Sequence, residues 1–213
     1  MSREERTGNR RKTRKSNFRK FDLGNYLIVT DALKTEENYL NGFIRSLPES
    51  FQQRINLKIV HCRTHELVER CLEIAAAEPQ YSENWIVFDR DRVVGFDSLI
   101  SSMEKKGIHA GWSNPCIEIW FFSYFTDIPG IYDSVECCKR FSALFYKKTG
   151  RKYDKAEWQI HELLSEYGNE EQALRRAKLK EKEHNRDGNN IPSKMCPCTV
   201  LYKLIEEIRS RII

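Results

Sequence analysis

The motif WIVFDRD at residues 85–91 gives the clearest indication of how this chain folds. Its first four residues form an unbroken apolar run, which is typical of a strand buried on both faces of a sheet. A short loop and the segment FDSLISSMEKKG, residues 96–107, follow it, and the apolar spacing of that segment predicts a helix. Asp89 and Asp91 should therefore lie at the carboxyl end of a buried strand.

The same order of elements occurs twice upstream of this stretch. An apolar, β-branched run at residues 26–30 precedes ENYLNGFIRSL at 37–47, which has helical spacing. A second strand is predicted at 57–60, before a helix over 64–77 whose apolar residues recur about every 3.6 positions. Because neighbouring parallel strands need helical crossovers, the alternation predicts an α/β fold with a mainly parallel sheet flanked by helices.

The later part of the chain is predicted to be mostly helical. Residues 108–112 have the pattern of a further short strand, but periodicity leaves 116–125 open between a helix and a long strand. Helical patterns then occupy the ranges 134–147, 156–167, 170–183 and 199–212. We therefore predict a helical C-terminal part that begins at about residue 134.

The first twenty residues form a basic tail. Nine lysines and arginines stand there against two glutamates, with few apolar residues, so residues 1–20 should be flexible unless they meet a partner. The remaining chain, 21–213, is long enough for one compact domain. Such a tail can aid solubility or dock an acidic partner, but its charge favours nucleic acid, bound by Arg10, Arg11, Lys12, Arg14 and Lys15.

Composition also bears on the compartment. No apolar stretch approaches the roughly 20 residues of a membrane-spanning helix, and the N-terminus has no apolar segment of a secretory signal. The seven cysteines show no repeated C-x-x-C pairs, so we interpret them as buried or free thiols in a reducing compartment. These observations predict a cytoplasmic protein with no membrane partner.

Four acidic residues follow the predicted strands. Ligands bind outside the carboxyl ends of strands in open parallel sheets, and this is where Asp31, Glu36, Asp89 and Asp91 are expected. Carboxylate oxygens are the ligands that Mg²⁺ and Mn²⁺ prefer, and such ions activate water and stabilise a transferring phosphoryl group. The alternative is structural: the aspartates cap a helix or pair with arginines, and Glu36 favours a helix dipole.

Glu118 stands inside the apolar run IEIWFFSYF at 117–125. An unpaired charge would be costly there, so Glu118 should have a bound cation, a basic partner or a hydrogen-bonding role. A salt bridge to a lysine or arginine of the helical part is the simpler account.

Taken in order, these motifs resemble the RloB family, which is associated with prokaryotic anti-phage defence and whose nuclease core looks like the Toprim fold. The resemblance spans roughly residues 22–209 and rests on LIVTDALKTEENYL (27–40), WIVFDRD (85–91), SNPCIEIW (113–120) and FYKK (145–148). The family usually has Glu-Gly after its first strand, where this chain has Asp31-Ala32.

The resemblance implies a metal-dependent endonuclease that hydrolyses phosphodiester bonds in tRNA, other RNA or DNA, controlled by an ATPase partner. It implies Mg²⁺ or Mn²⁺ held by Glu36, Asp89 and Asp91, with Asp31 and Glu118 completing the catalytic set. Lys34 and Lys147 are candidates for holding a phosphate, or are ordinary surface charges.

Two other functions stay open at this point. DRDRV at 89–93 also fits the start of haloacid-dehalogenase-like phosphatases, in which Asp89 would be a covalent nucleophile. A non-catalytic nucleic-acid-binding or regulatory subunit with a degenerate acidic site is the other alternative, because of Asp31-Ala32.

Overall fold

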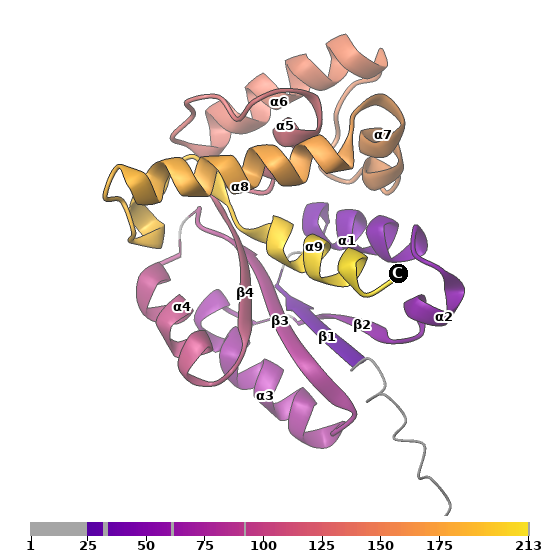
Figure 1. Ribbon diagram of the computed structural model, residues 1–213, viewed down its shortest axis with the longest axis vertical. Coiled ribbons are helices and arrows are strands. Elements are labelled where there is room, and N and C mark those ends of the chain that lie inside the picture. Colours follow the sequence, from indigo (N-terminus) through magenta and orange to yellow (C-terminus); the bar gives the residue numbers. More distant parts are fainter. Residues whose placement is uncertain (1–24, 32–33, 61, 92, 213) are drawn as a thin grey trace, which may run out of the picture.

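The computed structural model describes residues 25–31, 34–60, 62–91 and 93–212, and its centre is a five-stranded sheet (Figure 1). The strand order is β2-β1-β3-β4-β5. Four strands are parallel, and the fifth pairs antiparallel with β4. Their bounds are Asn25–Thr30 (β1), Ile55–Ile59 (β2), Tyr81–Asp89 (β3), His109–Asn114 (β4) and Cys198–Thr199 (β5). The predicted α/β class with a mainly parallel sheet is confirmed.

Alternation of side chains along the inner strands explains why their sequences are continuously apolar. In β1, Tyr26 and Ile28 belong to one buried cluster, whereas Leu27 and Val29 belong to a second cluster on the opposite face. β3 behaves in the same way, since it contributes to both clusters. A strand that is covered on both faces has no polar side to reveal its period.

Helices cover the two faces of the sheet (Figure 1). On one side lie α3 (Leu67–Ala77), entered through the 3₁₀ turn η1 (Thr64–Glu66), and α4 (Phe96–Lys105). On the other side lie α1 (Thr35–Arg45) and α9 (Leu201–Ser210), with the short α2 (Glu49–Gln52) leading into β2. Each predicted strand–helix pair is therefore present.

The helical C-terminal part lies beyond the carboxyl ends of β3 and β4, at the top of Figure 1. It contains α5 (Glu118–Phe125), α6 (Ser134–Thr149), α7 (Ile160–Tyr167) and α8 (Glu170–Arg186), followed by the 3₁₀ turn η2 (Pro192–Lys194). The segment that periodicity left open is thus helical. All residues of α5 except its last are buried, and a helix that is covered all round shows no amphipathic pattern.

Capping residues fix where α6 begins and ends. The Asp133 side chain accepts a hydrogen bond from the Glu136 backbone N–H and so caps the first turn. Gly150 ends the helix with φ of 71°, a left-handed conformation that glycine adopts at little cost. The cap places Ser134 and Cys138, one turn apart, on the side of α6 that faces Asp91 and Glu118.

Some features differ from the sequence prediction. The two-residue strand β5 was not expected; it follows the helix predicted at 170–183 and overlaps the first residue of the helix predicted at 199–212. The helix expected from residue 156 begins at Ile160. The basic tail lies outside the described residues. Within the described ranges, no helix combines the length and apolarity required to cross a bilayer.

Candidate acidic site

Three acidic side chains meet where three adjacent strands end. Asp89 is the last residue of β3, which lies between β1 and β4 in the sheet. Glu36 stands in the first turn of α1, just after β1, and Glu118 is the first residue of α5, just after β4. Because parallel strands present their carboxyl ends at one edge, residues that are 82 positions apart reach the same place.

Glu36 and Asp89 form a carboxyl pair. Their side chains are hydrogen bonded to each other, and Glu36 is only 8% exposed. Burial, with the added charge of Glu118, raises the pKa of Glu36 to about 7. Burial and the neighbouring Glu36 also raise the pKa of Asp89 well above its usual range, although the Ile117 backbone N–H donates to Asp89 and opposes the rise. The metal-free pair therefore retains a proton near neutral pH.

Glu118 has the partners that its buried position requires. It is 1% exposed, and its Oε1 accepts hydrogen bonds from the Tyr153 hydroxyl at 3.0 Å and the Cys138 thiol at 3.3 Å. The Lys155 ammonium lies 3.7 Å from the same oxygen. This confirms the expectation of a basic partner and a hydrogen-bonding role. The other oxygen, Oε2, has no hydrogen-bond partner among the described residues.

Tyr153 and Lys155 were not found from the sequence. Both stand in the segment between α6 and α7, which folds back over the start of α5. The Thr35 hydroxyl donates to the Lys155 carbonyl oxygen at 3.2 Å and so ties this segment to the first turn of α1. No local motif could have indicated these residues, because their partners are far away along the chain.

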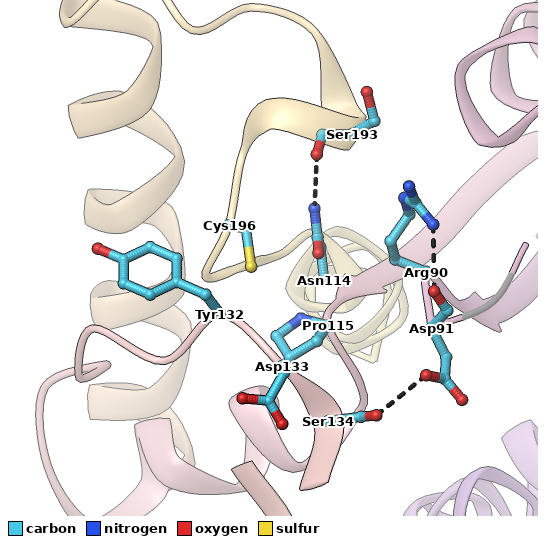
Figure 2. Close-up of a pocket in the computed structure, with 9 residues that line it drawn as sticks. All are labelled: Arg90, Asp91, Asn114, Pro115, Tyr132, Asp133, Ser134, Ser193 and Cys196. Atoms are coloured by element: carbon cyan, nitrogen blue, oxygen red, sulfur yellow. Dashed lines mark hydrogen bonds between the residues drawn. The ribbon is translucent and has the colours of Figure 1, made fainter. Parts of the chain in front are cut away.

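Asp91 lies at an open pocket rather than in the buried pair (Figure 2). Its side chain is exposed and accepts a hydrogen bond from the Ser134 hydroxyl at 2.9 Å. The Arg90 guanidinium donates to the Asp91 carbonyl oxygen at 3.1 Å. The cavity has a volume of about 270 Å³ and is lined by Arg90, Asp91, Asn114, Pro115, Tyr132, Asp133, Ser134, Ser193 and Cys196.

Asp31 has a hydrogen-bond partner outside the Glu36–Asp89 pair. It accepts a hydrogen bond from the Thr64 hydroxyl at 2.6 Å. Its charge nevertheless contributes to raising the pKa of Glu36, after the larger effects of burial and Glu118. Of the five predicted carboxylates, the structure thus brings Glu36, Asp89 and Glu118 together and places Asp31 and Asp91 at the margins.

One family model matches the part of the chain that contains this site. A family model described as RloB-like protein matches residues 26–208. The chain belongs to the RloB-like family. The match covers most of the chain and all five carboxylates, so the resemblance inferred from the motifs is confirmed. Comparisons with curated proteins and with solved structures find no match.

The predicted phosphate-binding cations of this RloB-like chain have different surroundings. Lys34 is exposed and stands directly before α1, two residues from Glu36. Lys147 is exposed in the last turn of α6, about 20 Å along the helix from Ser134. The predicted tail residues Arg10, Arg11, Lys12, Arg14 and Lys15 lie outside the described part of the chain. Lys34 is therefore the better placed of the two described lysines.

Thiols adjoin the acidic site of the RloB-like chain. All seven cysteines are free, as the sequence predicts. Cys138 donates to Glu118 Oε1 at 3.3 Å. One ligand atom from each of Cys116, Glu118 and Cys138 lies within 4.8 Å of the others. The spacing of these residues along the sequence does not predict the grouping, because Cys116 lies just before α5, Glu118 begins α5 and Cys138 lies in α6.

The residues of the acidic site fit a divalent cation. Glu36 and Asp89 are adjacent carboxyl groups, and burial together with the charge of neighbouring carboxylates raises the pKa of both. A hard cation would replace the proton and give these oxygens a ligand. Carboxylate oxygens are the donors that Mg²⁺ and Mn²⁺ prefer over thiophilic ions.

The carboxyl pair makes the stability of the metal-free protein dependent on pH. Glu36 binds its proton more tightly in the folded chain, so folding stability is greatest below pH 4.5 and falls as the pH rises through 7. The part of this loss due to Glu36 is about 3 kcal/mol, and the raised pKa of Asp89 adds to it. Urea unfolding in EDTA at pH 5 and pH 8 measures it. Glu36→Gln should remove the part of the loss that Glu36 contributes and leave the part due to Asp89, whereas the exposed control Glu69→Gln should retain the full loss; equal slopes in both variants would contradict the assignment.

Proposed function

We propose that this chain is a metal-dependent endonuclease of a prokaryotic anti-phage defence system, with a Toprim-like nuclease core. One observation supports the proposal above the others: Glu36, Asp89 and Glu118 gather at the carboxyl ends of adjacent parallel strands, where burial and their neighbours' charges raise the pKa values of Glu36 and Asp89. Membership of the RloB-like family agrees with this assignment. Strongly perturbed carboxyl groups at the ligand-binding edge of an α/β sheet are typical of functional sites.

Mg²⁺ or Mn²⁺ would be held by Glu36 and Asp89, with Asp91 or Glu118 contributing from either side. When bound, the ion would supply Lewis acidity toward a phosphoryl oxygen and toward the attacking water. The protein's own groups do the rest. Tyr153 and Lys155 fix the orientation of Glu118, and the Ile117 backbone N–H fixes Asp89. These contacts hold the carboxylates in place before a substrate arrives.

The pocket beside Asp91 is where we place the substrate (Figure 2). Tyr132 lines it with a side chain that is 72% exposed, and an exposed aromatic ring can stack on a nucleobase. The Ser134 hydroxyl, which now donates to Asp91, lies at the wall of the same cavity. Lys34 stands close to Glu36 along the chain and can neutralise a phosphate. The substrate class is nucleic acid, either RNA, including tRNA, or DNA.

Two further parts of the proposal concern partners. The basic tail would supply sequence-independent affinity, which should weaken steeply with salt. An ATPase subunit of the defence system would control the nuclease, as the family resemblance implies. Asp89 is hydrogen bonded to a second carboxyl group, which suits a cation ligand better than a covalent phosphatase nucleophile.

The test is to incubate the purified full chain with tRNA, other RNA and plasmid DNA, with Mg²⁺, with Mn²⁺ and with EDTA. Cleavage of at least one substrate that requires the ion supports the proposal. Because a partner could keep the nuclease silent, the same chain is also expressed in bacteria and growth is recorded. If the chain shows neither ion-dependent cleavage nor growth arrest when an ATPase partner is present, a regulatory subunit is favoured instead.

A further inference from the structure

The proposed nuclease leaves unexplained the two thiols beside Glu118, those of Cys116 and Cys138, which form a thiol–carboxylate cluster with it. Cys116 stands just before α5 and is buried, whereas Cys138 lies in the second turn of α6 and is partly exposed. One ligand atom from each of the three side chains lies within 4.8 Å of the other two. Two thiol sulfur atoms and one carboxylate oxygen are thus close to one another, so one metal ion could contact all three.

We propose that this cluster binds a thiophilic divalent cation such as Zn²⁺, in addition to the cation of the Glu36–Asp89 pair. Thiolate sulfur selects zinc over Mg²⁺ and Mn²⁺. Zinc binds sulfur at about 2.3 Å and oxygen at about 2.0–2.2 Å, which places neighbouring ligands of a tetrahedral ion about 3.5–3.8 Å apart. The Cys138 thiol already lies 3.3 Å from Glu118 Oε1.

The two oxygens of Glu118 support this site independently of the thiols. Oε1 is held by the Tyr153 hydroxyl at 3.0 Å, as the carboxylate ligands of metal sites are commonly held by an outer hydrogen bond. Oε2 is buried and has no partner among the described residues. A buried carboxylate oxygen without a partner is costly, and a bound cation would remove that cost.

The charges around a zinc ion bound at this cluster would sum to zero. Two thiolates and one carboxylate around a divalent cation leave one negative charge. The Lys155 ammonium, 3.7 Å from Glu118 Oε1, neutralises it. Three protein ligands leave the fourth position of a tetrahedral ion open to water. The site is therefore complete in charge and has its supporting contacts from this chain alone.

Cobalt(II) binding to the reduced, metal-free full chain, without nucleic acid, tests the proposal. Coordination by thiolates gives a charge-transfer absorption in the near ultraviolet, and Zn²⁺ should abolish it by displacement. We expect the band in the wild type and in Cys62→Ser, a partly buried cysteine outside the cluster. Cys138→Ser should lose most of it, and circular dichroism should show that this variant is folded.

Two further measurements use the same protein. Zn²⁺ should protect Cys116 and Cys138 of the wild type from alkylation, as identified by mass spectrometry. Tyr153→Phe should weaken Zn²⁺ binding by about 10–100-fold, because it removes the outer hydrogen bond to Glu118. The proposal is overturned by absence of the band in the wild type, by an undiminished band in Cys138→Ser, or by unchanged alkylation of both thiols. None of these readouts depends on nuclease activity.

Discussion

Asp89→Asn is expected to lower ion-dependent cleavage by on the order of 10³-fold. A bound cation contributes several kcal/mol to stabilising the transition state, and each 1.36 kcal/mol corresponds to about tenfold in rate. Asparagine offers one neutral carbonyl oxygen in place of a charged carboxylate, so the cation and its contribution should be lost together. The side chain keeps its shape and can still accept the Ile117 N–H, so the fold should persist.

The measurement is kcat/KM on the substrate that the wild type cleaves, in saturating Mg²⁺ or Mn²⁺. Glu69→Gln, a neutral replacement at an exposed position of α3, is the matched control and should cleave like the wild type. Cleavage by Asp89→Asn within a few-fold of the wild type would remove Asp89 from the site.

Phe141→Ala is expected to destabilise the protein by about 3–5 kcal/mol, the usual cost of deleting a buried phenylalanine ring. Phe141 is fully buried in α6 and lies at the centre of an aromatic group, with ring centroids 5.4–5.7 Å from those of Phe121, Phe122 and Phe145. Its closest aromatic neighbour is Tyr153, at 4.8 Å and nearly perpendicular. Removing the ring also removes the surface that positions the Tyr153 hydroxyl on Glu118.

Urea unfolding measures this loss, and Phe125→Ala is the matched control. Phe125 also packs against Phe141, but with stacked rings whose centroids are 6.5 Å apart, and it is partly exposed. The identical change there should cost roughly half as much, because part of the ring is already in water. A larger loss for Phe125→Ala than for Phe141→Ala would contradict the assigned centre of this group.

The parallel sheet could be predicted because its signals are local. An apolar run such as residues 85–88, followed by a helical pattern, indicates a buried strand and its crossover without any tertiary information. The two-residue strand β5 gave no such signal, since two residues establish no period. α5 stayed undecided for a different reason: burial on every side leaves no polar face to mark the helix.

The acidic site was predictable only in part. Asp89 and Glu36 could be named because each directly follows a strand, and the carboxyl ends of parallel strands share one edge. Which carboxylates actually meet depends on side-chain partners: Thr64 holds Asp31 and Ser134 holds Asp91. The contacts of Tyr153, Lys155 and Cys138 with Glu118 depend on how α6 and the segment after it fold back, and no pattern in the sequence encodes that return.

Binding of Mn²⁺ to the full chain at pH 8 can be followed by calorimetric titration and by thermal unfolding. This experiment tests whether Glu36 and Asp89 form a divalent-cation site. We expect the wild type and Glu69→Gln to bind the ion and to gain about 2.7 kcal/mol of stability when the free ion is at 100 times its Kd. Glu36→Gln and Asp89→Asn should show neither effect. Equal binding and equal stabilisation in these two variants would contradict the account.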